Sequence, residues 1–371
     1  MPAPSDMSVS SRLVALIRGA PTLWITSRRR ALGAAIAAII VLAPAIALEV
    51  SEPWRLMASV QPRRDAPRDT EVVSALAWSR AADIDVVLLL GGSTAREFTG
   101  SDAHVSELLT ARCGRPLRFI NAGTSQQTLA ESWAIAEAIP DDRRKLVVVG
   151  MNYLRLEEGY DQTRRTLPIK TMPFDTPAPL MAALDKAGHP VALTFPSLKN
   201  VAWLLRQGRW RGELSPPSTL AEFVGAADRS QAYQGPHNAY KAPALSGDEK
   251  DRIVRHRIVE RLTLFRAVHA EAAALWAEFT RRFDTAAGPV LYLALPESVA
   301  MAPLERLAGP AFDADMAKLR DSGALVADWR QGHGLDEADF HDQQHLLASG
   351  RARIEGRFVE LLAVSTPGCR R

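Results

Sequence analysis

Five short apolar runs, distributed along most of the chain, constrain its fold more than any other feature of the sequence. The runs are mostly continuous rather than alternating, and glycine or polar residues follow them. They cover residues 85–90, 117–120, 145–151, 290–295 and 324–327. Continuous apolar strands of this length are typical of a parallel sheet that is covered by helices on both faces. The sequence therefore predicts an α/β fold.

Helical patterns occupy the intervals between these runs. They are expected near residues 71–80, 103–112, 128–138, 250–284, 301–319 and 346–363. Strands that alternate with helices in this way predict a flavodoxin-like three-layer α/β/α sandwich over residues 71–371. Residues 155–247 break the rhythm with many prolines and a polar tract, and we expect them to form an insertion. The basic and aromatic residues of the insertion suit either a sugar-binding groove or a solvated surface loop.

An uncharged apolar run at residues 31–48 directly follows Arg28, Arg29 and Arg30. Its length suits a transmembrane helix, and the positive-inside rule places residues 1–30 in the cytoplasm. Residues 49–70 are then a linker to an exported domain. Two alternatives stay open. The small-x-small pattern at residues 45–47 fits a cleaved signal peptide, and the run also fits a buried core helix.

The charge pattern argues against nucleic-acid binding. The formal net charge is +3, and no long Lys/Arg block is interleaved with aromatic residues. The basic residues gather around the apolar run, which fits an anionic membrane surface. Cys113 and Cys369 form no metal-binding motif and are either a disulfide or two free thiols. We expect no metal and no diffusible cofactor.

Polar residues follow the predicted strands, at the edge where an open α/β sheet binds its ligands. Ser93 comes after the first run and two glycines, Gly123 after the second run and Asn152 after the third, whereas Asp342 and His345 follow the last run. Taken singly, each has an ordinary structural explanation as a turn residue, a helix cap or a surface histidine. Together they would bring a hydroxyl, two amide donors and an Asp/His pair to one edge of the sheet.

The order of these residues resembles the four motif blocks of the SGNH (GDSL-like) hydrolase superfamily. Ser93 matches the nucleophile, Gly123 and Asn152 match the second and third blocks, and Asp342-x-x-His345 matches the closing acid and base. The resemblance covers residues 85–363 apart from the insertion. His333 and His341 lie near His345 in the sequence, and His341 lacks the Asp-x-x-His spacing.

One position departs from the family pattern. The Asp of the usual Gly-Asp-Ser-Leu is Gly92 here. In this turn, and in its predicted anchor, the chain is similar to the divergent membrane-anchored branch that acts in polysaccharide O-acetylation and teichoic acid D-alanylation. That resemblance implies a single-pass protein of the bacterial inner membrane with its catalytic domain in the periplasm. It also implies a membrane-bound O-acyltransferase as partner.

The resemblance implies acyl chemistry at a serine. His345 would take the proton of Ser93, and Asp342 would orient the imidazole and stabilise its charged form. The Ser93 amide, the Gly123 amide and the Asn152 side chain would form the oxyanion hole. The expected function is transfer of an acyl group, with acetyl as the expected group, to a hydroxyl of an exported cell-envelope glycan.

Two other functions stay open on the sequence alone. An SGNH esterase or deacetylase would form the same acyl-enzyme and release it to water instead of a glycan hydroxyl. A non-catalytic component of an envelope-assembly complex would retain only the fold, and the complete set of Ser93, Asp342 and His345 argues against it. No motif identifies the acyl group, the glycan or the oligomeric state.

Overall fold

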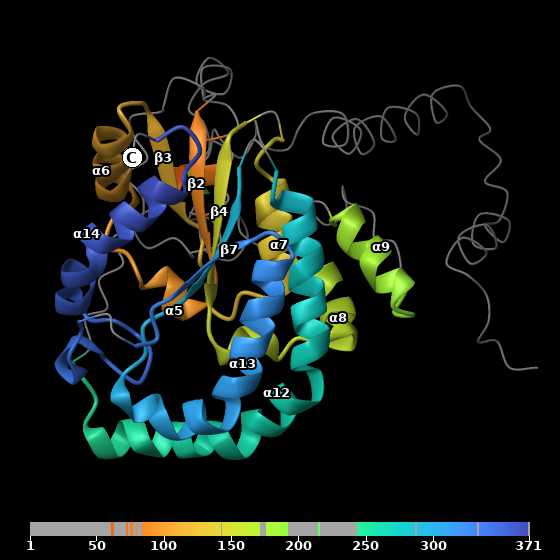
Figure 1. Ribbon diagram of the computed structural model, residues 1–371, viewed down its shortest axis with the longest axis vertical. Helices are drawn as coiled ribbons and strands as arrows, with labels where there is room; N and C mark the ends of the chain where they lie inside the picture. Colours follow the sequence, from red (N-terminus) through yellow and green to blue (C-terminus); the bar gives the residue numbers. More distant parts are fainter. Residues whose placement is uncertain are drawn as a thin grey trace, which may run out of the picture. The chain divides into compact units, whose positions relative to one another are not determined.

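Five parallel strands form the central sheet of the protein (Figure 1). They are β2 (Asp85–Leu90), β3 (Leu117–Asn121), β4 (Lys145–Met151), β6 (Val290–Ala294) and β7 (Leu325–Asp328). Their order in the sheet is β3-β2-β4-β6-β7, and every neighbouring pair is parallel. Counted along the chain within this sheet, the order is 2-1-3-4-5. The predicted α/β class is confirmed.

The computed structural model describes part of the chain. The described residues are 61–62, 72, 75–76, 79, 84–141, 143–170, 176–191, 214–215, 243–285, 288–331 and 334–369. Outside the central sheet, β1 (Gln61–Pro62) pairs antiparallel with β5 (Leu214–Ser215). The predicted membrane helix at residues 31–48 lies outside the described residues. Among the described helices, none combines the length and apolarity needed to cross a membrane.

The central strands are mostly apolar because their side chains alternate between two buried layers. In β2, Val86, Leu88 and Leu90 belong to one layer, whereas Val87 and Leu89 belong to the other. All five of these side chains are almost completely buried. Burial on both faces explains why the apolar runs of the sequence are continuous rather than alternating.

Helices cover both faces of the sheet and connect consecutive strands, as parallel pairing requires. One layer receives α7 (Leu129–Glu137), α12 (Gly247–Phe283) and α13 (Ala302–Asp321), and the other receives α6 (Asp102–Cys113) and α14 (Ala348–Ser365). The five helices predicted between residue 103 and the end of the chain begin and end close to these bounds. For the helix predicted at 71–80, the described residues Val72, Ala75, Leu76 and Ser79 are helical.

The connection between β4 and β6 is much longer than the others. Its described part contains η1 (Tyr153–Leu156), α8 (Tyr160–Lys170) and α9 (Ala178–Lys186) before α12 begins. The predicted insertion at 155–247 therefore contains two described helices and ends where α12 starts. A reciprocal capping box between Ser246 and Glu249 fixes that start.

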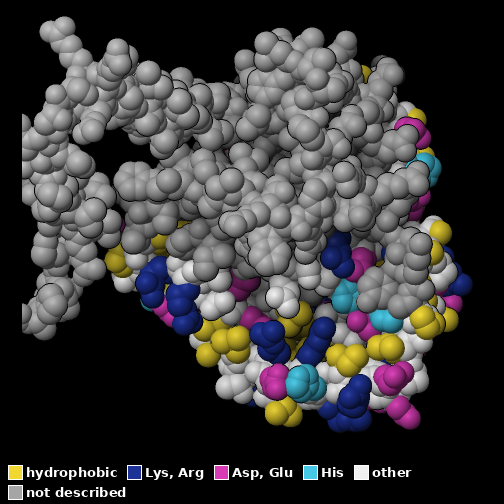
Figure 2. All heavy atoms as spheres, turned by 180° about the vertical axis from the view of Figure 1, so that it is seen from behind, with side chains coloured by type: hydrophobic (Ala, Val, Ile, Leu, Met, Phe, Trp, Pro, Cys, Tyr) yellow, Lys and Arg dark blue, Asp and Glu magenta, His cyan; other side chains and the backbone are white. Residues whose placement is uncertain are grey.

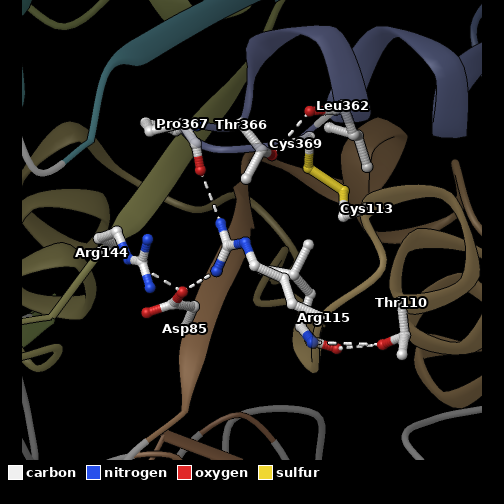
Figure 3. The surroundings of a disulfide bond; sticks show 10 residues. Asp85, Thr110, Cys113, Arg115, Arg144, Leu362, Thr366, Pro367 and Cys369 are labelled. Atoms are coloured by element: carbon white, nitrogen blue, oxygen red, sulfur yellow. Dashed lines mark hydrogen bonds and ion pairs between the residues drawn. A yellow bond between two sulfur atoms is a disulfide. The ribbon is translucent and has the colours of Figure 1, made fainter. Parts of the chain in front are cut away.

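Cys113 and Cys369 form a disulfide (Figure 3). The bond joins the last residue of α6 to the segment after α14, across 256 residues of sequence. Beside it, the Arg115 guanidinium donates to the Pro367 carbonyl at 2.6 Å and pairs with Asp85 at the start of β2 (Figure 3). The structure contains the disulfide, which is one of the two alternatives left open for the cysteines. The bond links the segment after α14 to the last residue of α6.

The described surface on the face in Figure 2 mixes charges of both signs with hydrophobic side chains. On that part of the face, Lys and Arg side chains do not gather into one broad area. Along α12, Arg281 pairs with Glu278 at 2.5 Å, and the His256 ring lies 3.1 Å from the Glu260 carboxylate. Exposed pairs of this kind contribute little to the free energy of unfolding.

Candidate active site

Ser93 lies just beyond the carboxyl end of β2, where the chain turns into the short helix α5 (Ser93–Arg96). Gly91 makes this turn with a φ of +151°, and a Cβ at this position would lie 2.4 Å from Ala95 Cβ. The Gly91 amide donates to Gln127 Oε1 at 2.7 Å, which ties the turn to the loop after β3. Ser93 is partly exposed, so its hydroxyl is accessible at a fixed turn.

A continuous chain of hydrogen bonds joins Ser93 to His345 and Asp342. Ser93 Oγ lies 2.8 Å from His345 Nε2, and His345 Nδ1 lies 2.7 Å from Asp342 Oδ2. Ser93 and His345 are 252 residues apart in the sequence, so the fold brings them together. The side chains of His345 and Asp342 are 13% and 14% exposed, so the imidazole is largely but not completely sheltered from solvent.

The loop that carries the Asp/His pair is closed on itself. An isolated bridge pairs Phe340 with Leu346, and the His341 amide donates to the His345 carbonyl at 2.8 Å. Asp342 Oδ1 accepts from the amides of Gln344 and His345, both at 2.9 Å. One carboxylate oxygen therefore shapes the loop, while the other contacts the imidazole.

The surroundings of Asp342 keep its carboxyl group ionised. Burial acts against the charged form, but hydrogen bonds from the His345 ring and from two backbone amides outweigh it and lower the pKa of Asp342 to about 2. A carboxylate facing Nδ1 favours the imidazole tautomer that carries its proton on that nitrogen. Nε2 is then the acceptor that faces the Ser93 hydroxyl.

Gly123 packs closely against α5, which is possible because glycine has no side chain. A Cβ at Gly123 would lie 2.6 Å from the Arg96 amide nitrogen. The Gly123 amide, which is the predicted oxyanion donor of the second block, donates to Asn121 Oδ1 at 3.0 Å. The Gly123 amide is thus beside α5 and already has an acceptor, Asn121 Oδ1, within its own loop.

Asn121 anchors α5 to β3. Its Nδ2 lies within hydrogen-bond distance of the carbonyls of Ala95 and Arg96, both at 3.0 Å, and of Thr99 Oγ1 at 2.8 Å. The sequence motifs indicate a role for Gly123 and none for Asn121. The one signal for Asn121 is its position two residues before Gly123, which suits a local turn.

Asn152 comes directly after β4 and is buried, with 6% of its surface exposed. Its Nδ2 donates to Thr94 Oγ1 at 3.3 Å, so it contacts the residue next to Ser93. Its Oδ1 is buried and has no hydrogen-bond partner among the residues that the structure describes. Thr94 was not singled out from the sequence, because a threonine at the second position of a helix has no distinctive pattern.

The structure therefore gathers all five predicted site residues around the carboxyl ends of β2, β3 and β4. His341 is directed elsewhere, since its Nδ1 lies 2.5 Å from the Pro243 carbonyl oxygen. His333 lies outside the described residues. Within the described ranges, no group of three or more His, Cys, Asp or Glu side chains is placed to hold a metal ion.

In comparisons with known proteins, no family model matches the chain and no curated protein matches it. The interpretation of this site therefore depends on its geometry and on the sequence motifs that define it.

Proposed function

We propose that this protein is a serine-dependent O-acyltransferase of the SGNH superfamily that acts on an exported cell-envelope glycan. The observation that carries the proposal is the chain of hydrogen bonds from Ser93 through His345 to Asp342, at 2.8 and 2.7 Å. A nucleophile, a base and an orienting carboxylate in this order are the groups that an acyl-enzyme mechanism requires. The strand order 2-1-3-4-5 supports the flavodoxin-like architecture of that superfamily.

The proposed reaction has two halves with the same proton carrier. Ser93 Oγ first attacks the carbonyl carbon of the acyl donor while His345 Nε2 takes the hydroxyl proton. The imidazolium gives that proton to the leaving group, and acyl-Ser93 remains. A glycan hydroxyl then loses its proton to His345 and attacks acyl-Ser93, and the proton returns to Ser93 Oγ. Asp342 stays ionised throughout and stabilises the imidazolium.

Three donors would bind the oxyanion that develops in each half. Ser93 is the first residue of α5, where a helix amide has no acceptor within the helix. The Gly123 amide and Asn152 Nδ2 donate to Asn121 Oδ1 and Thr94 Oγ1 in the free protein. In this proposal both donors share or redirect these bonds when the oxyanion forms. One donor of this kind typically lowers the barrier by about 3–4 kcal/mol.

The disulfide supports an exported location. Disulfides persist in oxidising compartments such as the bacterial periplasm. In this proposal the protein is held in the inner membrane by the predicted anchor at residues 31–48. It works there with a membrane-bound O-acyltransferase as partner. Tethering beside a membrane-embedded acyl donor raises the effective concentration of that donor. An anchor therefore favours transfer over hydrolysis as the physiological reaction.

The first prediction tests the nucleophile. Ser93→Ala should lower turnover of an activated acetyl ester by at least about 10³-fold, because no other group can form the acyl-enzyme. Labelling by a serine-directed phosphonate, measured by intact-protein mass spectrometry, should disappear as well. Ser125 is exposed in the loop after β3 and offers a matched control. Ser125→Ala should keep both ester turnover and phosphonate labelling at the wild-type level. Full turnover by Ser93→Ala would mean that the nucleophile is misassigned.

The same assay separates transfer from hydrolysis. The protein receives an activated acetyl ester with and without envelope oligosaccharides, and mass spectrometry detects acetylated sugar. Transfer predicts that the acceptor accelerates loss of the acyl-enzyme and gains its acetyl group. Rapid deacylation by water that no acceptor changes, together with stripping of acetylated glycan, would instead identify an esterase.

A further inference from the structure

The two residues between Asp342 and His345 are both held by one arginine. Arg257 Nη1 donates to Gln344 Oε1. In the amide orientation that matches donors to acceptors, Gln343 Oε1 accepts from Arg257 Nη2 at 2.8 Å and from Nη1 at 3.0 Å. Gln343 and Gln344 are 0% and 4% exposed. Both residues between Asp342 and His345 are thus buried against Arg257, which lies 87 positions before Gln344 in the sequence.

The start of α12, which carries Arg257, is fastened to the same loop. The Leu245 amide donates to the His341 carbonyl at 2.7 Å. Lys250 is 1% exposed, and its Nζ donates to the carbonyls of Glu337 and Phe340, both at 3.2 Å. These contacts lie on the amino-terminal side of the Asp/His pair. Arg257 therefore projects from a helix that is already fixed relative to the loop.

The residues after β6 contact the same two glutamines. The Ser298 amide donates to the Gln343 carbonyl at 3.1 Å, and Gln344 Nε2 donates to Glu297 Oε1 at 3.3 Å. These contacts use the backbone of Gln343 and the amide nitrogen of Gln344. The side-chain oxygens of both glutamines are left for Arg257, and a buried amide oxygen without a donor costs about 1–3 kcal/mol.

Arg257 also places its positive charge beside the candidate triad. Burial lowers the pKa of Arg257, whereas the carboxyl groups of Asp342, Glu157 and Glu297 act in the opposite direction. A guanidinium stays protonated in proteins under such influences. Its charge therefore favours the ionised form of Asp342, which orients the His345 ring.

We propose that Arg257 is a positioning residue for acyl transfer, because it holds Gln343 and Gln344 so that Asp342 and His345 keep the geometry that activates Ser93. The inference rests on the proposed function, since positioning matters only where the triad is catalytic. Arg257 acts through the two glutamines and not through contact with Ser93.

Arginine suits this role better than lysine. Its planar guanidinium presents several donors in a rigid fork, so two amide oxygens can be bound in one fixed arrangement. An ammonium group is a point charge on a flexible stem and would satisfy one glutamine at a time. The geometry therefore predicts partial function for lysine at this position and much less for an uncharged residue.

The test compares steady-state kinetics of the full chain for the wild type, Arg257→Gln, Arg257→Lys and Arg261→Gln with an activated acetyl ester. Arg261 lies one turn further along α12 and pairs with Glu157 at 3.2 Å, so it is a matched control. We expect Arg257→Gln to lower kcat by roughly 10- to 100-fold with little change in KM, because misplaced catalytic groups slow the chemical step. Arg257→Lys should recover part of kcat, and Arg261→Gln should match the wild type.

A second variant keeps the test decisive if Arg257→Gln does not fold. Gln344→Leu removes the acceptor and should also lower kcat. The double variant should lose less activity than the product of the two single effects, because both changes remove the contact between Arg257 and Gln344. The low-field proton resonance of His345 Nδ1–H should be present in the wild type and in Arg261→Gln. It should weaken in Arg257→Gln and in Gln344→Leu.

Two outcomes distinguish this inference from the proposed function. If Ser93→Ala abolishes turnover while Arg257→Gln and Gln344→Leu keep wild-type kcat and the same resonance, Arg257 is not a positioning residue and the proposed function stands. If Ser93→Ala keeps its turnover, the proposed function itself is overturned, whatever Arg257 does.

Discussion

Two asparagines flank the nucleophile strand, and their contacts give them different roles. Asn121 ends β3 and binds the carbonyls of Ala95 and Arg96, so it holds the helix on which Ser93 lies. Asn152 follows β4, donates to Thr94 Oγ1 and leaves its own Oδ1 without a partner among the described residues. A side chain with many structural bonds supports the fold, whereas one with a single long bond is available to a ligand.

This difference predicts opposite effects of two matched substitutions. Asn152→Ala should lower kcat by roughly 10²–10³-fold, the typical effect of losing one oxyanion donor, with little change in the free energy of unfolding. Asn121→Ala should lower the free energy of unfolding by about 2–3 kcal/mol, because it leaves buried backbone groups unpaired. Urea unfolding and ester turnover of both variants provide the measurement. The reverse pattern would contradict the assignment of the oxyanion donor.

For single residues, the sequence identifies those that belong to a short motif, and it misses those whose role depends on contacts with residues far away in the chain. Asp342 and His345 were predictable because their spacing is part of a motif, and Ser93 because it follows a strand and two glycines. Thr94 and Arg257 were not, since their partners lie far away in the sequence. The distance from Arg257 to Gln344 is 87 residues, and no pattern in the chain links them.

Among the elements, strands were predicted more easily than short helices. The strands of the central sheet coincide with the apolar runs, and β2, β4 and β6 are almost entirely buried, whereas β7 at the edge of the sheet is partly exposed. The helix α5 has four residues, and η3 (Val299–Met301) and η4 (Glu337–Asp339) have three each. Elements of one turn are too short to show a helical period, so the nucleophile helix was expected only as a turn.

The disulfide gives a prediction at the scale of the elements that it joins. Replacing Cys113 and Cys369 with serine should lower the free energy of unfolding by about 2–5 kcal/mol, because the bond restricts a long stretch of the unfolded chain. Urea unfolding of the wild type in a reducing buffer should give the value of the double variant. The variant itself should not respond to the reductant. Equal stability of the two proteins in oxidising buffer would contradict a structural role for the bond.

Two buried acidic side chains, Glu297 and Glu157, contribute to how the stability of the whole molecule responds to pH. Burial raises the pKa of Glu297 to about 8, with hydrogen bonding from Gln344 and the charge of Arg330 acting in the opposite direction. Burial also raises the pKa of Glu157 to about 7, against the charges of Arg261 and Arg257. Both carboxyl groups interact electrostatically with Arg257, and each binds its proton more tightly in the folded state than in the unfolded state.

The sign of the effect of pH on stability follows from which state, folded or unfolded, binds the Glu297 proton more tightly. Its pKa in the folded protein, about 8, lies above the ordinary value of 4.5, so the folded state holds the proton more strongly than the unfolded state. This contribution to the free energy of unfolding is complete below about pH 4.5 and is lost as the pH rises toward 8. The contribution of Glu297 to the stability of the wild type should therefore fall between about pH 4.5 and about pH 8.

Glu297→Gln should remove this contribution, because glutamine resembles the protonated acid at every pH. The variant should match the wild type near pH 5 and exceed it near pH 9, by on the order of a few kcal/mol in the free energy of unfolding. Urea unfolding of both proteins across this range measures the difference. Glu260→Gln, an exposed position on the same helix as Arg257, should follow the wild-type curve. Parallel curves for Glu297→Gln and the wild type would show that Glu297 titrates alike in the folded and unfolded states.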